Sequence, residues 1–379
     1  MSNPKLRFKR EDGTEFPEWE ETKIGNILTL CHGKDYKHLS KGNIPVMGTG
    51  GIITYVNKSL CDWECVCIGR KGTINKPYFM NTHFWSVDTL FYSKPLQNNN
   101  PKFQYYLFQN INWRFYNEAS GVPSLSASTI ENIRIIIPHH EEQQKIADFL
   151  SNVDDVISQS EAEVRNLEQQ KKAAMQKIFS QEVRFKREDG TSYSNWETNP
   201  IGKYARIFDG VHQTPNYIES GVPFVSVEDI ETLEKPTKFI SVEDYKRDFK
   251  TKPHQGDILM TRIGDVGRTA IVPCNGYAYY VSLALIKPFE IVNNEFLCQA
   301  MKNDYFQKEL WEHTIHTAFP KKINAGDIQH CKIALPFDIK EQQKIADFLS
   351  AYDEAITYAK QELNKWKELK KGLLQQMFV

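Results

Sequence analysis

An eleven-residue segment that occurs twice constrains the fold of this chain more than any other feature of its sequence. The segment reads EEQQKIADFLS at 141–151 and KEQQKIADFLS at 340–350, and the two copies differ only in their first residue. A shorter segment, RFKREDGT, occurs at 7–14 and again at 184–191. Both pairs keep their order along the chain, which indicates a tandem duplication. Because the period is well above one hundred residues, it favours duplicated domains over a solenoid of short repeats.

Fainter matches between these segments support the duplication. A tryptophan follows each copy of the short segment, at Trp19 and Trp196. Each copy of the eleven-residue segment is preceded by a related stretch, SLSASTIENIRIIIP at 124–138 and KINAGDIQHCKIALP at 322–336. The chain therefore consists of a variable globular block, a nearly constant segment, and then both again.

The composition is that of an ordinary globular protein. Of the 379 residues, 40% are hydrophobic and 12% aromatic, and the length favours two or three domains. Lys and Arg number 47 against 48 Asp and Glu, so net charge neither favours nor excludes a polyanionic partner. No apolar run approaches the roughly 20 residues of a membrane span, and the N-terminal residues lack the apolar core of a secretory signal. Seven scattered cysteines fit a reducing compartment, so we expect a cytoplasmic protein.

The constant segment begins a long predicted helix. Residues 141–179 contain no proline or glycine and are rich in good helix formers. Apolar or small residues recur in alternating steps of four and three in each copy, a 3.5-residue period that is typical of a coiled-coil seam. Each helix would be about 60 Å long. The predicted seam residues are Ile146, Leu150, Val153, Ile157, Val164 and Leu167 in the first helix, and Ile345, Leu349, Tyr352, Ile356, Leu363 and Trp366 in the second.

The two helices are expected to pair with each other as an antiparallel coiled coil, because a pseudo-twofold axis relating the two halves reverses the helix direction. The alternative is that each helix packs only on its own globular block. Phe149 and Phe348 lie beside the seam, and two interpretations remain open for them. They widen the core within the chain, or they contact helices of another protein.

Each globular block is predicted to combine short strands with a few helices, which is an α+β fold. The helical stretches are 101–119 and 293–313. The sequence GTGG at 48–51 predicts a hairpin turn, since no Gly-Lys-Ser/Thr completes a phosphate-binding loop. The strand-forming stretches are 44–56, 65–74 and 84–92 in the first block, and 257–272 and 279–288 in the second.

Basic turns bordered by glycine are the feature most suggestive of binding. Arg70 and Lys71 lie between Gly69 and Gly72, and these small neighbours let the backbone approach a partner closely. Arg and Lys neutralise phosphates or bond to guanine, while Asn and Gln read adenine. The alternative is ordinary solvated loop charge. The candidate DNA-binding residues are Arg70, Lys71, Thr73 and Lys76 in the first block, and Gln213, Arg262, Arg268, Lys321, Lys322 and Asn324 in the second.

Catalytic and metal sites have little support in the sequence. Cys65 and Cys67 alternate along a predicted strand and would share one face, so buried thiols are a simpler interpretation than zinc ligands. His139 and His140 directly precede the long helix and are expected to be turn residues. No methyltransferase or nuclease signature is found, and we expect no catalytic residues, no metal and no cofactor bound by this chain.

Together these features resemble the DNA-specificity subunit of type I restriction-modification enzymes. The resemblance rests on two variable blocks, each closed by EQQKIADFL and a long helix, and on the stretches IPVMGTGGIITYV, IGRKGTINKPYF, FWSVDTLFY and GDILMTRIGDVGRTAIV. It implies two globular target-recognition domains separated by two long helices in an antiparallel coiled coil, as a pseudo-twofold tandem repeat. The implied boundaries are 1–140 for the first recognition domain with its N-terminal arm, 141–180 for the first helix, 181–339 for the second domain with its linker, and 340–379 for the second helix.

The resemblance also implies a function and partners. In that family each recognition domain reads one half of a bipartite, asymmetric site in double-stranded DNA. The helices fix the spacing and dock two methyltransferase subunits, which endonuclease and translocase subunits then join. S-adenosylmethionine, ATP and Mg²⁺ are expected in those partners, so this chain is expected to be non-catalytic and to bind no membrane.

Net charge limits how such a chain would hold DNA. Residues 18–140 contain twelve Lys and Arg against nine Asp and Glu, whereas residues 196–339 contain sixteen against nineteen. Affinity must therefore come from a local basic face or from partner subunits that close around the duplex.

Two other functions remain open from the residues alone. The first is a coiled-coil scaffold that presents two protein-binding domains without DNA recognition. The second is an enzyme with an unrecognised site. Salt-dependent duplex binding distinguishes DNA recognition from the scaffold, and turnover by the isolated chain would indicate the enzyme.

Overall fold

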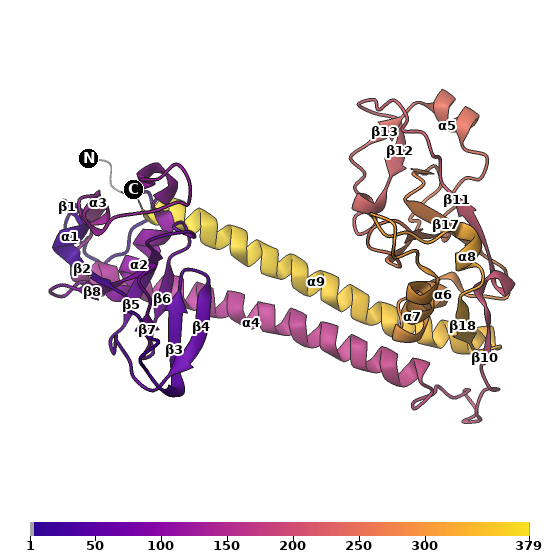
Figure 1. Cartoon of the computed structure of the whole chain (residues 1–379), viewed down its shortest axis with the longest axis horizontal. Helices are drawn as coiled ribbons and strands as arrows, with labels where there is room; N and C mark the ends of the chain where they lie inside the picture. The colour runs from indigo at the N-terminus through magenta and orange to yellow at the C-terminus, as the bar shows by residue number, and fades with distance from the viewer. Residues whose placement is uncertain (1–3, 379) are drawn as a thin grey trace. The chain divides into compact units, whose positions relative to one another are not determined.

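The computed structural model describes residues 4–378, which form two compact units (Figure 1). Residues up to 162 and from 360 onward make the first unit, and residues 163–359 make the second. Both long helices contribute to both units, because α4 (His140–Phe179) and α9 (Ile339–Met377) each cross the boundary. Among the described residues, no helix is both long and apolar enough to cross a membrane.

The first unit is built from three small sheets. The largest is antiparallel, with strands in the order β2 (Leu28–His32), β8 (Leu90–Pro95), β5 (Cys65–Gly69) and β6 (Tyr78–Met80). The second has the order β4 (Gly51–Val56), β3 (Lys41–Gly48) and β7 (Trp85–Ser86), and β1 (Glu20–Lys23) pairs with β9 (Arg134–Ile137). The helices are α1 (Ile24–Ile27), α2 (Pro101–Asn110), α3 (Ala127–Glu131) and a 3₁₀ turn at Trp113–Tyr116.

The second unit repeats this topology strand for strand. Its largest sheet has the order β11 (Ala205–Asp209), β17 (Leu283–Pro288), β14 (Ile258–Thr261) and β15 (Thr269–Ile271). The smaller sheets are β13 (Phe239–Ile240), β12 (Val222–Val225) and β16 (Ala278–Tyr279), and the pair β10 (Glu197–Pro200) and β18 (Lys332–Leu335). The helices are α5 (Val242–Asp248), α6 (Asn294–Met301), α7 (Asp304–His313) and α8 (Ala325–Ile328), with 3₁₀ turns at Ile201–Lys203 and Val227–Asp229.

The predicted α+β fold of the blocks is confirmed, and both predicted block helices are corrected in length. The first ends at Asn110 instead of Ala119, since Ile111 takes an extended backbone. The second is broken after Met301, where Asn303 caps a new helix by accepting a hydrogen bond from the N–H of Phe306 (3.0 Å). The glycines at 48–51 form the predicted hairpin turn between β3 and β4.

Strand β5 lies between two hydrophobic clusters, so all five of its residues are buried. Val66 and Ile68 face one cluster, while Cys65 and Cys67 face the other together with Cys61. The prediction that Cys65 and Cys67 share one face is therefore confirmed.

A buried carboxylate near the start of α4 joins the N-terminal arm to the helix. Glu142 accepts hydrogen bonds from Arg7 Nε (3.1 Å) and Nη2 (2.8 Å), and from the indole N–H of Trp19 (3.2 Å). Arg7 Nη2 also donates to the carbonyl of Pro17 (2.6 Å). The side chain of Glu142 is fully buried, so its charge is matched only by these donors. We call this arrangement the arm–helix junction.

The second unit contains the same junction at the start of α9. Glu341 accepts from Arg184 Nε (3.1 Å) and Nη2 (2.8 Å), and from the indole N–H of Trp196 (3.3 Å). Arg184 also donates to the carbonyl of Ser194 (2.7 Å). The two repeated segments of the sequence thus meet in space in each unit.

The residues after each carboxylate fasten further parts of the same unit. Gln143 accepts from the backbone N–H of Asn100 (3.1 Å), directly before α2, and Lys145 donates to the carbonyl of Lys9 (2.8 Å). Gln342 and Lys344 repeat these bonds with Asn293 (2.8 Å) and Lys186 (2.8 Å). The near-constant letters EQQK therefore have a structural role within the chain.

The residues beside the seam contact the arm of their own unit. The Phe149 ring packs edge-to-face on Phe8, with centroids 5.6 Å apart, and the Phe348 ring packs on Phe185 at 5.7 Å. Both rings therefore pack within the chain, but Phe348 keeps 40% of its surface exposed, so its contact with helices of another protein stays a prediction.

The two long helices run antiparallel within each unit. In the first unit Asp154 pairs with Lys370 (2.7 Å) and Glu161 with Lys367 (2.7 Å), so residue numbers rise along α4 as they fall along α9. In the second unit Ile178, near the end of α4, shares a cluster with Ile345 and Leu349, near the start of α9. The predicted antiparallel pairing is confirmed. All twelve predicted seam residues are buried or half-buried.

Two polar pairs interrupt the apolar seam at equivalent positions. Lys171 donates to Asp353 (2.6 Å), which also accepts from Gln299, and Lys370 bonds to Asp154, which accepts from Tyr106 (2.8 Å). Burial lowers the pKa of Lys171, and the hydrogen bond to Asp353 opposes that shift. The lysine of each pair is largely buried and the aspartate is partly exposed, so such a pair adds little stability but penalises a helix that slips out of register.

Glu142→Ala should destabilise the first unit by about 3–5 kcal/mol, because it leaves Arg7 and the Trp19 indole without their acceptor. Hydrogen exchange of the full chain should show lost protection in residues 4–162 and little change in 184–336. Glu141→Ala, next to it but exposed, is the matched control and should change stability by less than about 0.5 kcal/mol. Equal effects of the two substitutions would contradict the role of the junction.

Candidate nucleic-acid interface

The predicted basic turn of the first unit follows β5 and is held by backbone hydrogen bonds. The N–H of Arg70 donates to Thr89 (2.8 Å), and the carbonyl of Arg70 accepts from Leu125 (2.9 Å). Gly72, at φ +87°, donates to Pro123 (2.8 Å). This positive φ favours glycine, so the residue type that borders the turn is dictated by its backbone.

The second unit repeats the turn after β14. The N–H of Arg262 donates to Ser282 (2.9 Å), and its carbonyl accepts from Ile323 (2.9 Å). Gly264, at φ +82°, donates to Lys321 (2.8 Å). In both units, therefore, a loop that comes much later in the sequence lies against the turn. The match between 124–138 and 322–336 was the sequence signal for this contact.

The structure corrects the prediction for Arg262. Its guanidinium donates to the carbonyls of Val281 (2.8 Å) and Ile323 (3.0 Å), and it pairs with Asp209 (3.0 Å). Only 7% of the side chain is exposed. An arginine whose donors are satisfied inside the fold is not available to a base edge, so Arg262 is a structural residue that ties β14 to its neighbours.

Arg70 occupies the equivalent position but keeps a freer side chain. It is half-buried, and its Nη1 donates to the carbonyl of Asp88 at 3.3 Å. The register of the sheet places His32 where the second unit has Asp209, since His32 pairs with Phe91 and Asp209 with Ala284. Arg70 thus lacks the carboxylate that holds Arg262.

The other predicted residues of the first unit lie in the same connection between β5 and β6. Lys71 and Lys76 are exposed, and Thr73 is half-buried. With Arg70 they place three cationic side chains within seven residues on one loop. Their spacing suits contacts to phosphates, which position a protein on a duplex.

The predicted residues of the second unit form two groups. Lys321, Lys322 and Asn324 are exposed, and the first two belong to the loop that contacts the Arg262 turn. Arg268 is half-buried and pairs with Glu231 (3.1 Å) and Asp265 (3.2 Å), so a phosphate must compete with two carboxylates for it.

Gln213 lies apart from both groups, in a polar cavity of about 510 Å³ between the loop after β11 and the end of α5. The cavity is also lined by His212, Asn216 and Arg247. Arg247 pairs with Asp244 and Asp248, and these contacts raise its pKa.

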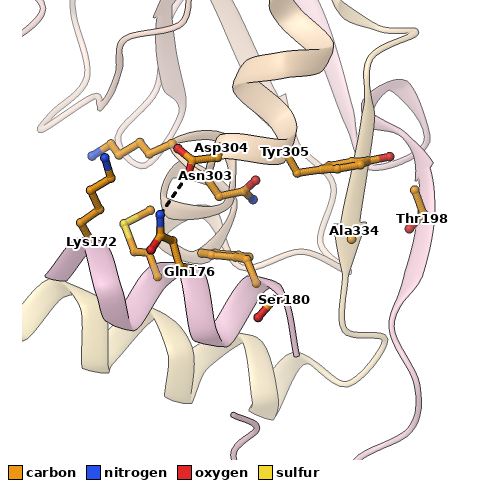
Figure 2. Close-up of a pocket in the computed structure, with 11 residues that line it drawn as sticks. Lys172, Gln176, Ser180, Thr198, Asn303, Asp304, Tyr305 and Ala334 are labelled. Atoms are coloured by element: carbon orange, nitrogen blue, oxygen red, sulfur yellow. Dashed lines mark hydrogen bonds between the residues drawn. The ribbon is translucent and has the colours of Figure 1, made fainter. Parts of the chain in front are cut away.

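A second cavity of the second unit, about 460 Å³, has apolar walls (Figure 2). Figure 2 shows Lys172 and Gln176 of α4 on the side that faces Asp304 of α7, and Gln176 donates to Asp304 (3.3 Å). Its lining combines charged and polar side chains with Met175 and Phe179, and it contains no histidine or cysteine.

Metal-ligand geometry occurs at one place among residues 4–378. His139, His140 and Glu141 bring their ligand atoms within 4.8 Å of one another, and all three are exposed. The thiols of Cys61 and Cys65 lie 3.8 Å apart, and their hydrogen bond and burial raise the pKa of Cys61, which keeps it a neutral thiol.

A comparison with protein families matches the type I restriction modification DNA specificity domain to residues 17–169 and again to 194–368. These two stretches correspond to the duplicated halves of the chain and cover most of it. The chain belongs to this specificity-domain family. The resemblance drawn from the sequence is thereby confirmed.

Relatives named as specificity subunits match either nearly the whole chain or part of it. The type I restriction enzyme MjaVIII specificity subunit of Methanocaldococcus jannaschii is 24% identical over 419 residues, which cover 97% of this chain and 94% of the relative. The EcoprrI specificity subunit of Escherichia coli is 24% identical over 160 residues, or 39% of this chain and 38% of the relative. A crystal structure of the S subunit from M. genitalium shares the fold, with a TM-score of 0.70 and 15% identity over 100% of this chain and 99% of that one.

Replacing the two equivalent arginines of this specificity-domain protein should lower the stability by very different amounts. Arg262→Ala should destabilise the second unit by roughly 2–4 kcal/mol, because it leaves buried carbonyls unpaired and Asp209 without its partner. Arg70→Ala should cost less than about 0.5 kcal/mol. Urea denaturation of the full chain measures both, and equal losses would refute the distinction between them.

Proposed function

We propose that this chain is the DNA-specificity subunit of a type I restriction-modification complex and that each unit reads one half of a bipartite, asymmetric site. The observation that carries the proposal is the specificity-domain match to both halves. The strand-for-strand duplication supports two readers on one chain. The two globular blocks differ in sequence, whereas the starts of the two long helices are nearly identical. This difference fits the reading of two half-sites of different sequence.

The first unit is proposed to read its half-site through the β5–β6 connection, with Arg70 toward a base edge and Lys71 and Lys76 on phosphates. In the second unit we assign contacts to Lys321, Lys322, Asn324 and Gln213. The attraction of a phosphate depends mainly on the charges close to it. These side chains can therefore bind DNA even though the second block as a whole has more acidic than basic residues.

The chemistry is assigned to partner subunits. Two methyltransferase subunits would dock on the long helices, and restriction subunits would join them, with S-adenosylmethionine, ATP and Mg²⁺ bound by those partners. Support for partners comes from relatives named as specificity subunits and from a similar fold in a structure titled for complex assembly of the type I R-M system (TM-score 0.56, 15% identity, 96% of this chain and 98% of that one). We place this function in the cytoplasm.

Deleting the gene should abolish N6-methyladenine at one bipartite motif across the host genome and leave other motifs unchanged. Single-molecule sequencing of genomic DNA with and without the gene measures this. Purified chain without partners should transfer no methyl group to a duplex that carries the motif. An unchanged methylation pattern would refute the proposal, and methyl transfer by the isolated chain would refute the assignment of chemistry to the partners.

Removing one heptad from each helix should change the preferred spacing between half-sites. Deleting Gln159–Arg165 and Tyr358–Asn364 keeps the seam in phase and shortens each helix by about 10 Å, or about three base pairs. Three base pairs also rotate one half-site by about 100°. The assembled complex should therefore prefer a shorter spacer or lose binding, as measured with duplexes that differ only in spacer length. Full affinity for the original spacer would contradict a helical ruler.

A further inference from the structure

The loop between α7 and α8 is held as a closed hairpin against the turn at Arg262. The N–H of Ile315 donates to the carbonyl of Lys322 (2.7 Å), which closes the base of the loop. Gly264 donates to Lys321 (2.8 Å), which fixes the same strand of the loop to the turn. A loop fastened on both sides can hold a side chain at its tip in a defined direction.

Phe319 lies near the tip of this loop, and its side chain is fully in solvent. At 103% exposure it is the most exposed large apolar side chain among residues 4–378, ahead of Phe115 and Phe337. Most phenylalanine side chains are buried, because exposing an apolar ring to water costs free energy. A single exposed apolar residue does not by itself indicate a partner, so the residues around Phe319 decide whether it has one.

The chemistry around Phe319 selects an anionic partner. No aspartate or glutamate occurs between Glu312 and Asp327, whereas Lys321 and Lys322 lie directly beside the tip. Lys321 stacks on the Trp311 ring, with Nζ 4.5 Å from its centroid, so its cation is held near the loop. An apolar ring with two adjacent lysines matches stacked bases flanked by phosphates.

The equivalent loop of the first unit has no ring at the position of Phe319. Pro123 accepts from Gly72 as Lys321 accepts from Gly264, so Gly121 corresponds to Phe319 and Val122 to Pro320. Val122 is an exposed apolar residue near the same turn, but it is not aromatic. The exposed ring is therefore a feature of the second unit alone.

We propose that Phe319 is a DNA wedge, which inserts its ring at a base step of the half-site read by the second unit and partly unstacks it. This rests on the proposed function. Rings inserted in this way unwind and kink the duplex and add stacking contacts. Val122 has no ring, so only the second half-site is unwound. Phe319 thereby makes recognition sensitive to how easily that base step deforms, beyond the hydrogen bonds read at base edges.

The test uses the chain assembled with its methyltransferase subunits and a plasmid that carries the genomic methylation motif. Plasmid relaxed by topoisomerase in the presence of saturating complex reports unwinding as a change in linking number. Phe319→Ala should reduce that change and weaken binding to a motif duplex by about tenfold to a hundredfold. Phe319→Trp should keep the change in linking number and the affinity for the motif duplex, because the tryptophan ring also stacks on bases. Phe337→Ala is the matched control, an equally apolar exposed residue elsewhere in the same unit, and should behave as wild type.

Each other outcome has a definite meaning. If wild-type complex shows no preference for the motif over a scrambled duplex, the proposed function fails before the wedge is tested. If wild type binds the motif and Phe319→Ala gives the same affinity and linking number, the wedge alone is refuted. If folded Phe319→Ala chain no longer assembles with the methyltransferase subunits, the ring contacts protein, and the wedge is again refuted.

Discussion

The buried carboxylate of the arm–helix junction is the interaction on which each unit depends. Glu142 and Glu341 each sit at the start of a long helix and satisfy an arginine and a tryptophan from the arm that precedes the sheets. A fully buried charge is tolerated only with such a set of donors. The junction thereby fixes the arm, the helix and, through Gln143 or Gln342, the start of the next helix in one arrangement.

This arrangement gives a physical reason why one part of the chain is nearly identical in its two halves while the rest differs between them. Changing any member of the junction leaves a buried charge or donor unpaired, so its residues are constrained together. Apart from the buried Arg262, the side chains of the loops after β5 and β14 carry no such constraint. The loops keep their backbone hydrogen bonds while their side chains differ, which suits a reader of two different half-sites.

Several features of the site followed from sequence, and others did not. Both turns were singled out in the sequence for basic residues near glycines, and the backbone hydrogen bonds show that Arg70 and Arg262 are equivalent. The sequence did not show that Arg262 is buried and paired with a carboxylate whereas Arg70 is not. This difference depends on whether the neighbouring strand supplies Asp209 or His32, a contact between distant segments that only sheet register reveals.

The sequence by itself determined the duplication and the two long helices with their apolar seams, because periodic patterns of apolar residues are local and persist through many turns. The antiparallel direction of the helices was an expectation from a pseudo-twofold relation of the halves, and the ion pairs between the helices confirmed it. The sequence also determined the family. Tertiary structure decided where the predicted helix at 293–313 breaks, which arginine is buried and which apolar side chain faces water. Burial and pairing depend on residues brought together from far apart along the chain, and a single sequence carries no periodic signal for such contacts.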